Sequence, residues 1–304
     1  MPVQFVDSTP ILENGDALRA RSEEDGYLFF KKLIPAKDIL AVRADVLSVV
    51  RQHGWLQLEH NELGAEIKRD VFANIPESAM RTDIGVTHTI YNEVQKLESV
   101  HRLPHHAKIL SFFERLFDRQ VLVHPRHIAR MVTLHPAMVP TPQHQDYPLI
   151  QGTSATWTAW IPLGDCPRTM GGLTVLRASH QLGYLPIDTA QGAGLIAAQL
   201  CPTDPPDWAE IDYEVGDVLT FPSFTVHRAL PATIKDSIRL SLDVRYQSID
   251  EVIETRSLLP HCDLSWAEIY SGWRRDDLKY YWLNLPLNFQ EWDDSLMQPK
   301  KRIC

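Results

Sequence analysis

Residues 238–247 read IRLSLDVRYQ, a stretch in which apolar and polar side chains alternate at every position. Successive side chains of a β-strand point to opposite faces, so this alternation predicts a strand with one apolar and one polar face. The apolar face, formed by every second residue from Ile238 to Tyr246, can pack on helices. The opposite face, which carries Arg239, Asp243 and Arg245, can line the interior of a barrel.

The same kind of strand recurs along the middle of the chain. β-Branched or aromatic runs separated by Pro and Gly turns extend over about 130 residues from Val121. They are VLVHPRHIARMVTLH (121–135), ATWTAWIPLGD (155–165), GLTVLRASH (172–180), GDVLTFPS (216–223) and SIRLSLDVRYQ (237–247). This spacing predicts a mainly β fold, an antiparallel sandwich or jelly roll, with helices bracing one face.

Helical patterns precede these strands and return after them. A helix is expected to end at Gly26, before a short strand at 27–30, and residues 35–54 and 105–118 carry apolar stripes at helical spacing. The tail from Asp250 is rich in Trp and Tyr, which we expect to pack as core rather than to form an aromatic cage. No flexible linker interrupts the chain, so we expect one domain over residues 1–304 with its β-helix core at about 120–250.

The composition of the chain limits which binding partners and which cellular location we expect. The net charge is −9 without a basic run, which excludes nucleic acid and anionic membranes as expected partners. No stretch reaches the ~18 apolar residues of a membrane span, and the first residues lack a signal-peptide pattern, so the sequence favours a cytoplasmic location. Four widely spaced cysteines are expected to be reduced thiols: Cys166, Cys201, Cys262 and Cys304.

The triplet His144-Gln145-Asp146 contains two potential metal ligands one residue apart. In a strand the side chains at i and i+2 leave the same face, so His144 and Asp146 can meet at one ion. The triplet alone is weak evidence, but His227 follows an apolar strand in GDVLTFPSFTVHRALP and supplies a third ligand. Two imidazoles and one carboxylate leave three positions open on an octahedral ion, as in non-haem Fe(II) oxygenases that bind a bidentate co-substrate and O₂.

Arg239 extends this pattern to the co-substrate. It lies 12 residues after His227 on the polar face of the expected strand. A 2-oxo acid that chelates iron through one end needs a cation for its far carboxylate, and a guanidinium suits a carboxylate better than an ammonium does. The ordered set of four residues is therefore far more specific than the triplet.

With these motifs in order, the chain resembles the phytanoyl-CoA dioxygenase-like family of Fe(II)/2-oxoglutarate-dependent oxygenases. The resemblance runs from EDGYLFFKKLIP to RLSLDVRYQ, roughly four-fifths of the chain. It implies a double-stranded β-helix, or cupin-like jelly roll, with flanking helices. It also implies His144, Asp146 and His227 as catalytic iron ligands and Arg239 as the 2-oxoglutarate arginine. It also implies Gln145 and Trp160 in the co-substrate pocket. Two departures are that RASH (177–180) replaces a Pro-Gly-Ser-His turn, and that HRALPATIKDS lacks the usual Asn after the distal histidine.

The expected function is that of an Fe(II)- and 2-oxoglutarate-dependent dioxygenase that uses O₂ to hydroxylate an unactivated C–H bond of a small molecule. The same iron centre could instead catalyse desaturation, epimerisation or cyclisation in natural-product biosynthesis. A non-catalytic, metal-binding cupin-like module is the alternative from another class, and Arg239 argues against it. Asp146 argues against halogenation, which needs its coordination position for chloride. The substrate and the oligomeric state stay open.

Several further polar residues allow two interpretations of their role. Asp243 and Arg245 either hold a polar substrate or pair with each other, and Arg126 and Arg130 could reach the co-substrate. His180 is expected to be a turn residue bonded to backbone. Three histidines could line the cavity but are by default satisfied or exposed. These are His124, His127 and His135.

Overall fold

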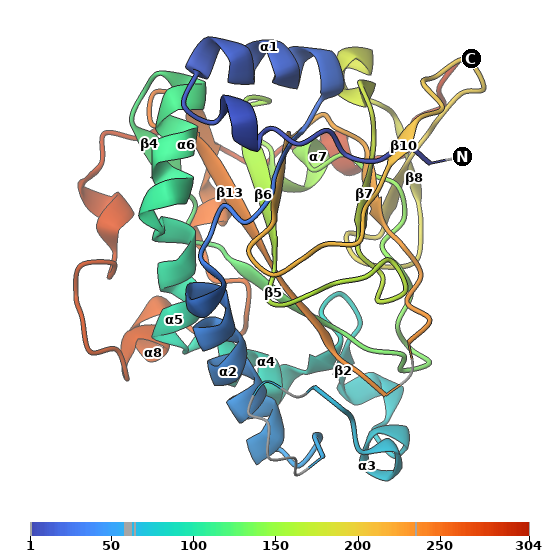
Figure 1. Cartoon of the computed structure of the whole chain (residues 1–304), viewed down its shortest axis with the longest axis vertical. Coiled ribbons are helices and arrows are strands. Elements are labelled where there is room, and N and C mark those ends of the chain that lie inside the picture. Colours follow the sequence, from blue (N-terminus) through green and yellow to red (C-terminus); the bar gives the residue numbers. More distant parts are fainter. Residues whose placement is uncertain (1, 58–62, 64, 235, 304) are drawn as a thin grey trace.

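The computed structural model describes residues 2–57, 63, 65–234 and 236–303 (Figure 1). Its central element is a six-stranded antiparallel sheet in the order β1-β11-β6-β13-β4, in which β5 also pairs with β13. The strands are β1 (Leu28–Phe30), β4 (Val121–Val123), β5 (Ile128–Val132), β6 (Trp157–Pro162), β11 (Val218–Pro222) and β13 (Arg239–Ser248).

A smaller antiparallel sheet, β10-β7-β12, forms the second layer. It consists of β7 (Leu173–Leu176), β10 (Trp208–Ala209) and β12 (His227–Ala229). Side chains of both sheets meet in one apolar cluster that includes Val175, Leu219 and Phe221. Two-stranded ribbons complete the β structure: β2 (Met80–Arg81) with β3 (Val86–Thr87), β8 (Ile187–Thr189) with β9 (Ile196–Ala198), and β14 (Val252–Glu254) with β15 (Asn288–Gln290).

The α-helices of the described residues are α1 (Gly15–Asp25), α2 (Ala36–Gln52), α3 (Arg69–Ala73), α4 (His88–Gln95), α5 (Glu98–Arg102), α6 (Ala107–Phe117), α7 (Tyr147–Ile150) and α8 (Trp266–Tyr270). Side chains of α1, α2, α4, α5 and α6 join those of the large sheet in one core cluster, whereas α8 packs within the C-terminal tail. Figure 1 shows α2, α5 and α6 along one side of the strands. The predicted mainly β fold with flanking helices is confirmed.

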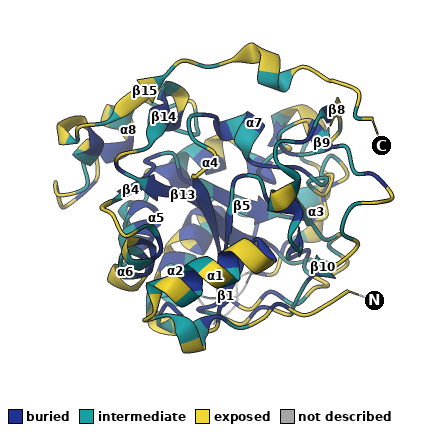
Figure 2. Cartoon of the chain, turned by 90° about the horizontal axis from the view of Figure 1, so that it is seen from above, coloured by how far each residue is buried: buried dark blue, intermediate teal, exposed yellow. Residues whose placement is uncertain are grey.

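Strand β13 lies between the helix-covered core and the barrel interior, and it contributes side chains to both. Its alternate residues Leu240, Leu242, Val244 and Tyr246 pack in the large core cluster with side chains of α2, α4 and α6. Tyr246 stacks on Phe113 of α6 with ring centroids 4.2 Å apart. The polar residues between them face the barrel interior and are buried as well, so β13 appears dark blue in Figure 2.

Two helix and strand boundaries follow from local signals. Asn14 caps α1 by accepting a hydrogen bond from the Ala17 backbone N–H at 3.0 Å, and Gly26 ends it at φ 75°, as predicted.

The run 121–135, which the sequence predicted as one strand, forms two strands in the structure. It breaks between β4 and β5 at residues 124–127, where Pro125 lacks a backbone donor, and both pieces pair with β13.

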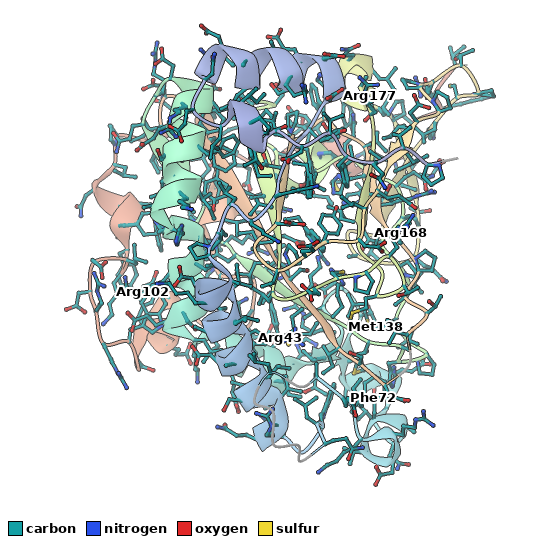
Figure 3. All side chains as sticks on the ribbon, viewed as in Figure 1. Arg43, Phe72, Arg102, Met138, Arg168 and Arg177 are labelled. Carbon is teal, nitrogen blue, oxygen red and sulfur yellow. The ribbon has the colours of Figure 1, made fainter. Side chains whose placement is uncertain are left out.

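The unusual turn at 177–180 is accommodated without a glycine. Ala178 adopts φ 59°, in the left-handed region that favours glycine. Arg177 donates from Nε to Oδ1 of Asp25 at 2.6 Å, and His180 bonds the Glu23 carbonyl at 3.1 Å, so both side chains tie the turn to the end of α1 (Figure 3). The prediction that His180 bonds backbone is confirmed.

The aromatic tail packs as core from Trp266 to Trp282, as predicted, whereas Trp292 lines a pocket instead. Trp266, Tyr270, Trp273 and Trp282 form one cluster. The indole N–H of Trp273 donates to the Lys96 carbonyl at 3.0 Å. These contacts hold the tail against the segment between α4 and α5.

The cysteine prediction is wrong at one position. Cys201 is disulfide-bonded, whereas Cys166 and Cys262 are free. Wide spacing along a chain does not exclude a bridge, because the fold decides which sulfurs come within bonding range. In the described part of the chain, no helix is both long and apolar enough to cross a bilayer.

Candidate metal centre

Two histidines face each other where the small sheet meets the loop before α7. His144 and His227 form an antiparallel bridge in which each backbone N–H donates to the other's carbonyl at 3.0 Å. Their ring centroids lie 4.2 Å apart. Asp146 follows at the N-cap of α7, and the three buried residues each offer a ligand atom within 4.8 Å of the others.

Backbone carbonyls orient both imidazoles. Nδ1 of His144 donates to the Pro142 carbonyl at 2.8 Å, and Nδ1 of His227 donates to the Thr225 carbonyl at 3.0 Å. Since a carbonyl can only accept, each ring presents an unprotonated Nε2, and both Nε2 atoms lie 3.8 Å from Oδ1 of Asp146. The three donors thus converge as the sequence predicted.

Electrostatics favour the metal-binding protonation states. Burial, reinforced by the neighbouring His227, lowers the pKa of His144 to about 3, and burial also lowers the pKa of His227. Burial by itself would raise the pKa of Asp146, but Arg245 and the two imidazoles hold that pKa below its usual value. At neutral pH the set is two neutral imidazoles and one carboxylate, which fits Fe(II).

The carboxylate of Asp146 is oriented by two side chains. The Thr158 hydroxyl donates to Oδ2, and Nη2 of Arg245 lies 3.3 Å from the carboxylate oxygens. Asp243 instead pairs with Arg130 from β5. The prediction that Asp243 and Arg245 pair with each other is therefore wrong, because these same-face neighbours on β13 pair with residues from other segments. The alternative, that they hold a polar substrate, stays a prediction.

A narrow cavity of about 40 Å³ connects this cluster to Arg239. Nη1 of Arg239 donates to the Ser241 hydroxyl at 2.9 Å, and its guanidinium carbon lies 5.6 Å from the centre of the Trp160 ring. Its Nε is buried without a hydrogen-bond partner among the described residues. A buried donor without a partner fits a ligand carboxylate at this end of the cavity. Arg239 and Trp160 thus line one cavity with the three candidate ligands, and their roles toward the co-substrate stay a prediction.

Gln145 lies outside this cavity, contrary to expectation. Both hydrogens of its amide are engaged, with the Gly183 carbonyl at 2.7 Å and the Phe224 carbonyl at 2.6 Å. Its amide oxygen accepts from the Leu185 backbone N–H at 2.8 Å. The side chain between the two candidate ligands points to the opposite side and ties neighbouring loops together.

A second pocket of about 300 Å³, called the large pocket below, also has His144 and Asp146 in its wall. Part of this wall comes from the C-terminal region: from Trp292, which the sequence analysis expected in the core, and from Glu254, Arg256 and His261, which it did not single out. No local pattern marks these residues, because their position depends on how the tail returns to the barrel.

The remaining histidines of the expected strand have partners. His124 lines the large pocket and bonds Oε1 of Gln247 at 2.8 Å, and His135 bonds the Ile75 carbonyl at 3.0 Å. His127 packs beside His101 under the aromatic tail. The default reading of satisfied histidines is correct for His124 and His135.

A facial set of two histidines and one aspartate, with a buried arginine at the end of a jelly-roll cavity, defines the iron- and 2-oxo-acid-dependent oxygenases. Comparison with known proteins agrees. The phytanoyl-CoA dioxygenase (PhyH) profile matches residues 22–239, and the chain belongs to this family. It is therefore an enzyme of the iron(II)- and 2-oxoglutarate-dependent oxygenase class, with O₂ as the second co-substrate, as the sequence predicted.

Individual relatives are more distant. The chain is 25% identical over 258 residues to 1-deoxypentalenic acid 11-beta-hydroxylase of Streptomyces arenae, covering 80% of this chain and 84% of the relative. The Streptomyces exfoliatus hydroxylase of the same name is 25% identical over 260 residues, with the same coverage.

Solved structures share the fold. The epimerase SnoN, crystallised with Fe³⁺, alpha-ketoglutarate and nogalamycin RO, gives a TM-score of 0.54 at 21% identity, covering 80% of this chain and 86% of SnoN. The carbocyclase SnoK gives 0.53 at 22% identity, covering 82% and 89%. The double-stranded β-helix prediction is confirmed.

Proposed function

We propose that the chain is a hydroxylase of a small molecule in which His144, Asp146 and His227 bind the catalytic Fe(II). Arg239, beside Trp160, binds the far carboxylate of 2-oxoglutarate. The observation that carries this proposal is the convergence of two unprotonated Nε2 atoms and one carboxylate at the end of a cavity whose other end holds a partly unpaired guanidinium.

Charge balance supports this assignment. Asp146 offsets one of the two iron charges, and a dianionic 2-oxo acid needs one further cation at its far end. Burial lowers the pKa of Arg239, but a guanidinium stays charged at neutral pH. The charges of metal, Asp146, co-substrate and Arg239 then sum to zero inside a dehydrated barrel.

The residues of the chain have separate tasks in this reaction. Iron and 2-oxoglutarate together supply the O₂-dependent oxidation of a C–H bond. The carbonyls of Pro142 and Thr225 hold the imidazoles, while Thr158 and Arg245 fix the rotation of the Asp146 carboxylate. The buried walls of the narrow cavity exclude water from the co-substrate.

The substrate occupies the 300 Å³ pocket beside the metal ligands in this proposal. Both Streptomyces relatives named above are hydroxylases of 1-deoxypentalenic acid, which supports hydroxylation as the outcome and a small organic acid as the substrate type.

We also propose one domain over residues 1–304, because the tail both packs on the core and lines this pocket. We also propose a cytoplasmic location, which the free thiols of Cys166 and Cys262 support and the disulfide at Cys201 opposes.

The test is an anaerobic titration of 2-oxoglutarate into the Fe(II)-loaded protein, followed by its metal-to-ligand charge-transfer band. The wild type should show a saturable band and, after O₂ is admitted, form succinate. Arg168→Gln (Arg168 is labelled in Figure 3) should behave as the wild type, because Arg168 is exposed, pairs with Asp212 and does not line the cavity. A wild-type protein with neither band nor succinate would contradict the proposed function.

A further inference from the structure

Arg126 is held in place at the wall of the large pocket. It lies in the turn between β4 and β5, and its Nη1 donates to the backbone carbonyls of Leu259, at 3.1 Å, and Pro260. The other edge of the guanidinium, Nε and Nη2, has no hydrogen-bond acceptor among the residues the structure describes. An arginine anchored through one nitrogen thus presents a free two-pronged edge, the geometry that matches a carboxylate.

The charges around the pocket leave this cation without a counter-ion. Arg126 and the exposed Arg256 both line the pocket, and neither guanidinium is ion-paired with a carboxylate in the described ranges. The pocket's own carboxylates are engaged. Asp83 pairs with Arg81, Asp146 with Arg245, and Glu254 accepts from the Arg256 backbone and the Thr255 hydroxyl.

The pocket histidines do not change this balance. His124 and His261 both line the pocket. Burial lowers the pKa of His124 to about 4, and burial together with Arg126 and other arginines keeps the pKa of His261 well below its usual value. Both rings are neutral at neutral pH, so the charged side chains that line the pocket leave a net surplus of one positive charge.

The missing anion is not the co-substrate. Arg239 lines the narrow cavity but not the large pocket, whereas Arg126 and Arg256 line the large pocket but not the cavity. In the proposed function 2-oxoglutarate lies in the cavity with its far carboxylate on Arg239. The anion at Arg126 therefore belongs to the molecule in the large pocket.

We propose that the substrate carries a carboxylate, and that Arg126 binds it through its Nε–Nη2 edge with Arg256 as a second cation. This inference rests on the proposed function and deepens it by naming the residues that hold the acid group of an organic acid with an apolar skeleton. Ile128, Leu149, Ile150 and Trp292 provide the apolar wall. Arg256 is positioned by stacking over the Trp292 ring at 4.2 Å. Fixing the carboxylate at one wall determines which carbon of the skeleton lies nearest the metal.

The experiment compares two probes of the same shape, 1-adamantanecarboxylate and 1-adamantanecarboxamide, by calorimetric binding. Binding is measured on the metal-free protein and on the anaerobic Fe(II)–2-oxoglutarate protein. The wild type should prefer the acid by about ten- to a hundredfold, the range expected for one charge-assisted pair. Arg126→Gln should remove most of this preference, Arg126→Lys should keep part of it, and Arg256→Gln should reduce it less. Arg168→Gln should leave it unchanged.

Equal affinity of the two probes for the wild type would overturn the proposal, as would an Arg126→Gln variant that is folded by circular dichroism and keeps the full preference. If Arg126→Gln fails to fold, the wild-type preference and its reduction in Arg256→Gln decide the question. Because the preference is also measured without metal, a failure of the iron chemistry would show separately, as a missing charge-transfer band.

Discussion

The narrow metal cavity and the large pocket beside it share four residues, yet they are built in different ways. Arg130, His144, Asp146 and Arg245 line both. The rest of the cavity comes from strand residues that the sheet register brings together, such as Trp160 opposite Asp243. The rest of the pocket comes from turns and the C-terminal region, such as Arg126 and Trp292. The cavity is thus fixed by backbone pairing, whereas the pocket can vary without disturbing it.

The largest effect should come from the residues that converge at the metal. Ala in place of His144, Asp146 or His227 should abolish turnover and sharply weaken Fe(II) binding, because three ligands are the minimum of this facial site. Bound iron, succinate formation and circular dichroism are the measurements. His88→Ala is the control, an exposed histidine paired with Asp263. Full activity in any ligand variant would remove that residue from the site.

Arg239 tests the other end of the cavity. Arg239→Ala would leave the far carboxylate of 2-oxoglutarate buried and unpaired, a loss of ~2–5 kcal/mol, or roughly 30- to several-thousand-fold in affinity. Iron affinity should barely change, and Arg239→Lys should rescue only partly because it lacks the two-pronged geometry. The charge-transfer titration measures the 2-oxoglutarate affinity of both variants, and bound iron is measured separately. Unchanged 2-oxoglutarate affinity in Arg239→Ala would break the assignment, with Arg130 and Arg245 as the next candidates.

A Trp292 variant tests whether ligand binding in the large pocket is independent of 2-oxoglutarate binding in the cavity. Trp292→Ala should weaken 1-adamantanecarboxylate binding by about tenfold, because the probe loses an aromatic wall and Arg256 loses its stacking partner. The 2-oxoglutarate affinity should stay within about twofold of wild type. A parallel loss of both affinities would show that the two sites are not independent.

The smallest effect concerns the histidines beneath the aromatic tail. Burial lowers the pKa of His101 and of His105 to about 4. Unfolded histidines take up protons near pH 6.5, so between pH 6.5 and 4 the unfolded chain binds more protons. The free energy of unfolding should therefore fall as the pH falls through this window. Melting temperatures of the metal-free protein from pH 7 to 4 test this, and His101→Phe should lessen the slope. A flat profile would contradict the prediction.

Much of the cavity could be predicted because its signals are local. The alternation of residues 238–247 predicted both the strand and its interior face, and the order of His144, Asp146, His227 and Arg239 predicted which side chains meet. Strand periodicity fixes the face of each side chain, and few registers bury the apolar face correctly. That is why four residues scattered over about a hundred positions could be placed together.

Only the tertiary structure decided the partners of those side chains. Asp243 and Arg245 are neighbours on one face of β13, but Arg130 takes the first and Asp146 takes the second. Gln145 turns away to bind the loops at Gly183, Leu185 and Phe224. The approach of Arg256 and Trp292 to the pocket depends on where the tail returns to the barrel. Periodicity is a property of neighbouring residues, whereas ion pairs and pocket walls depend on distances between segments far apart in the chain.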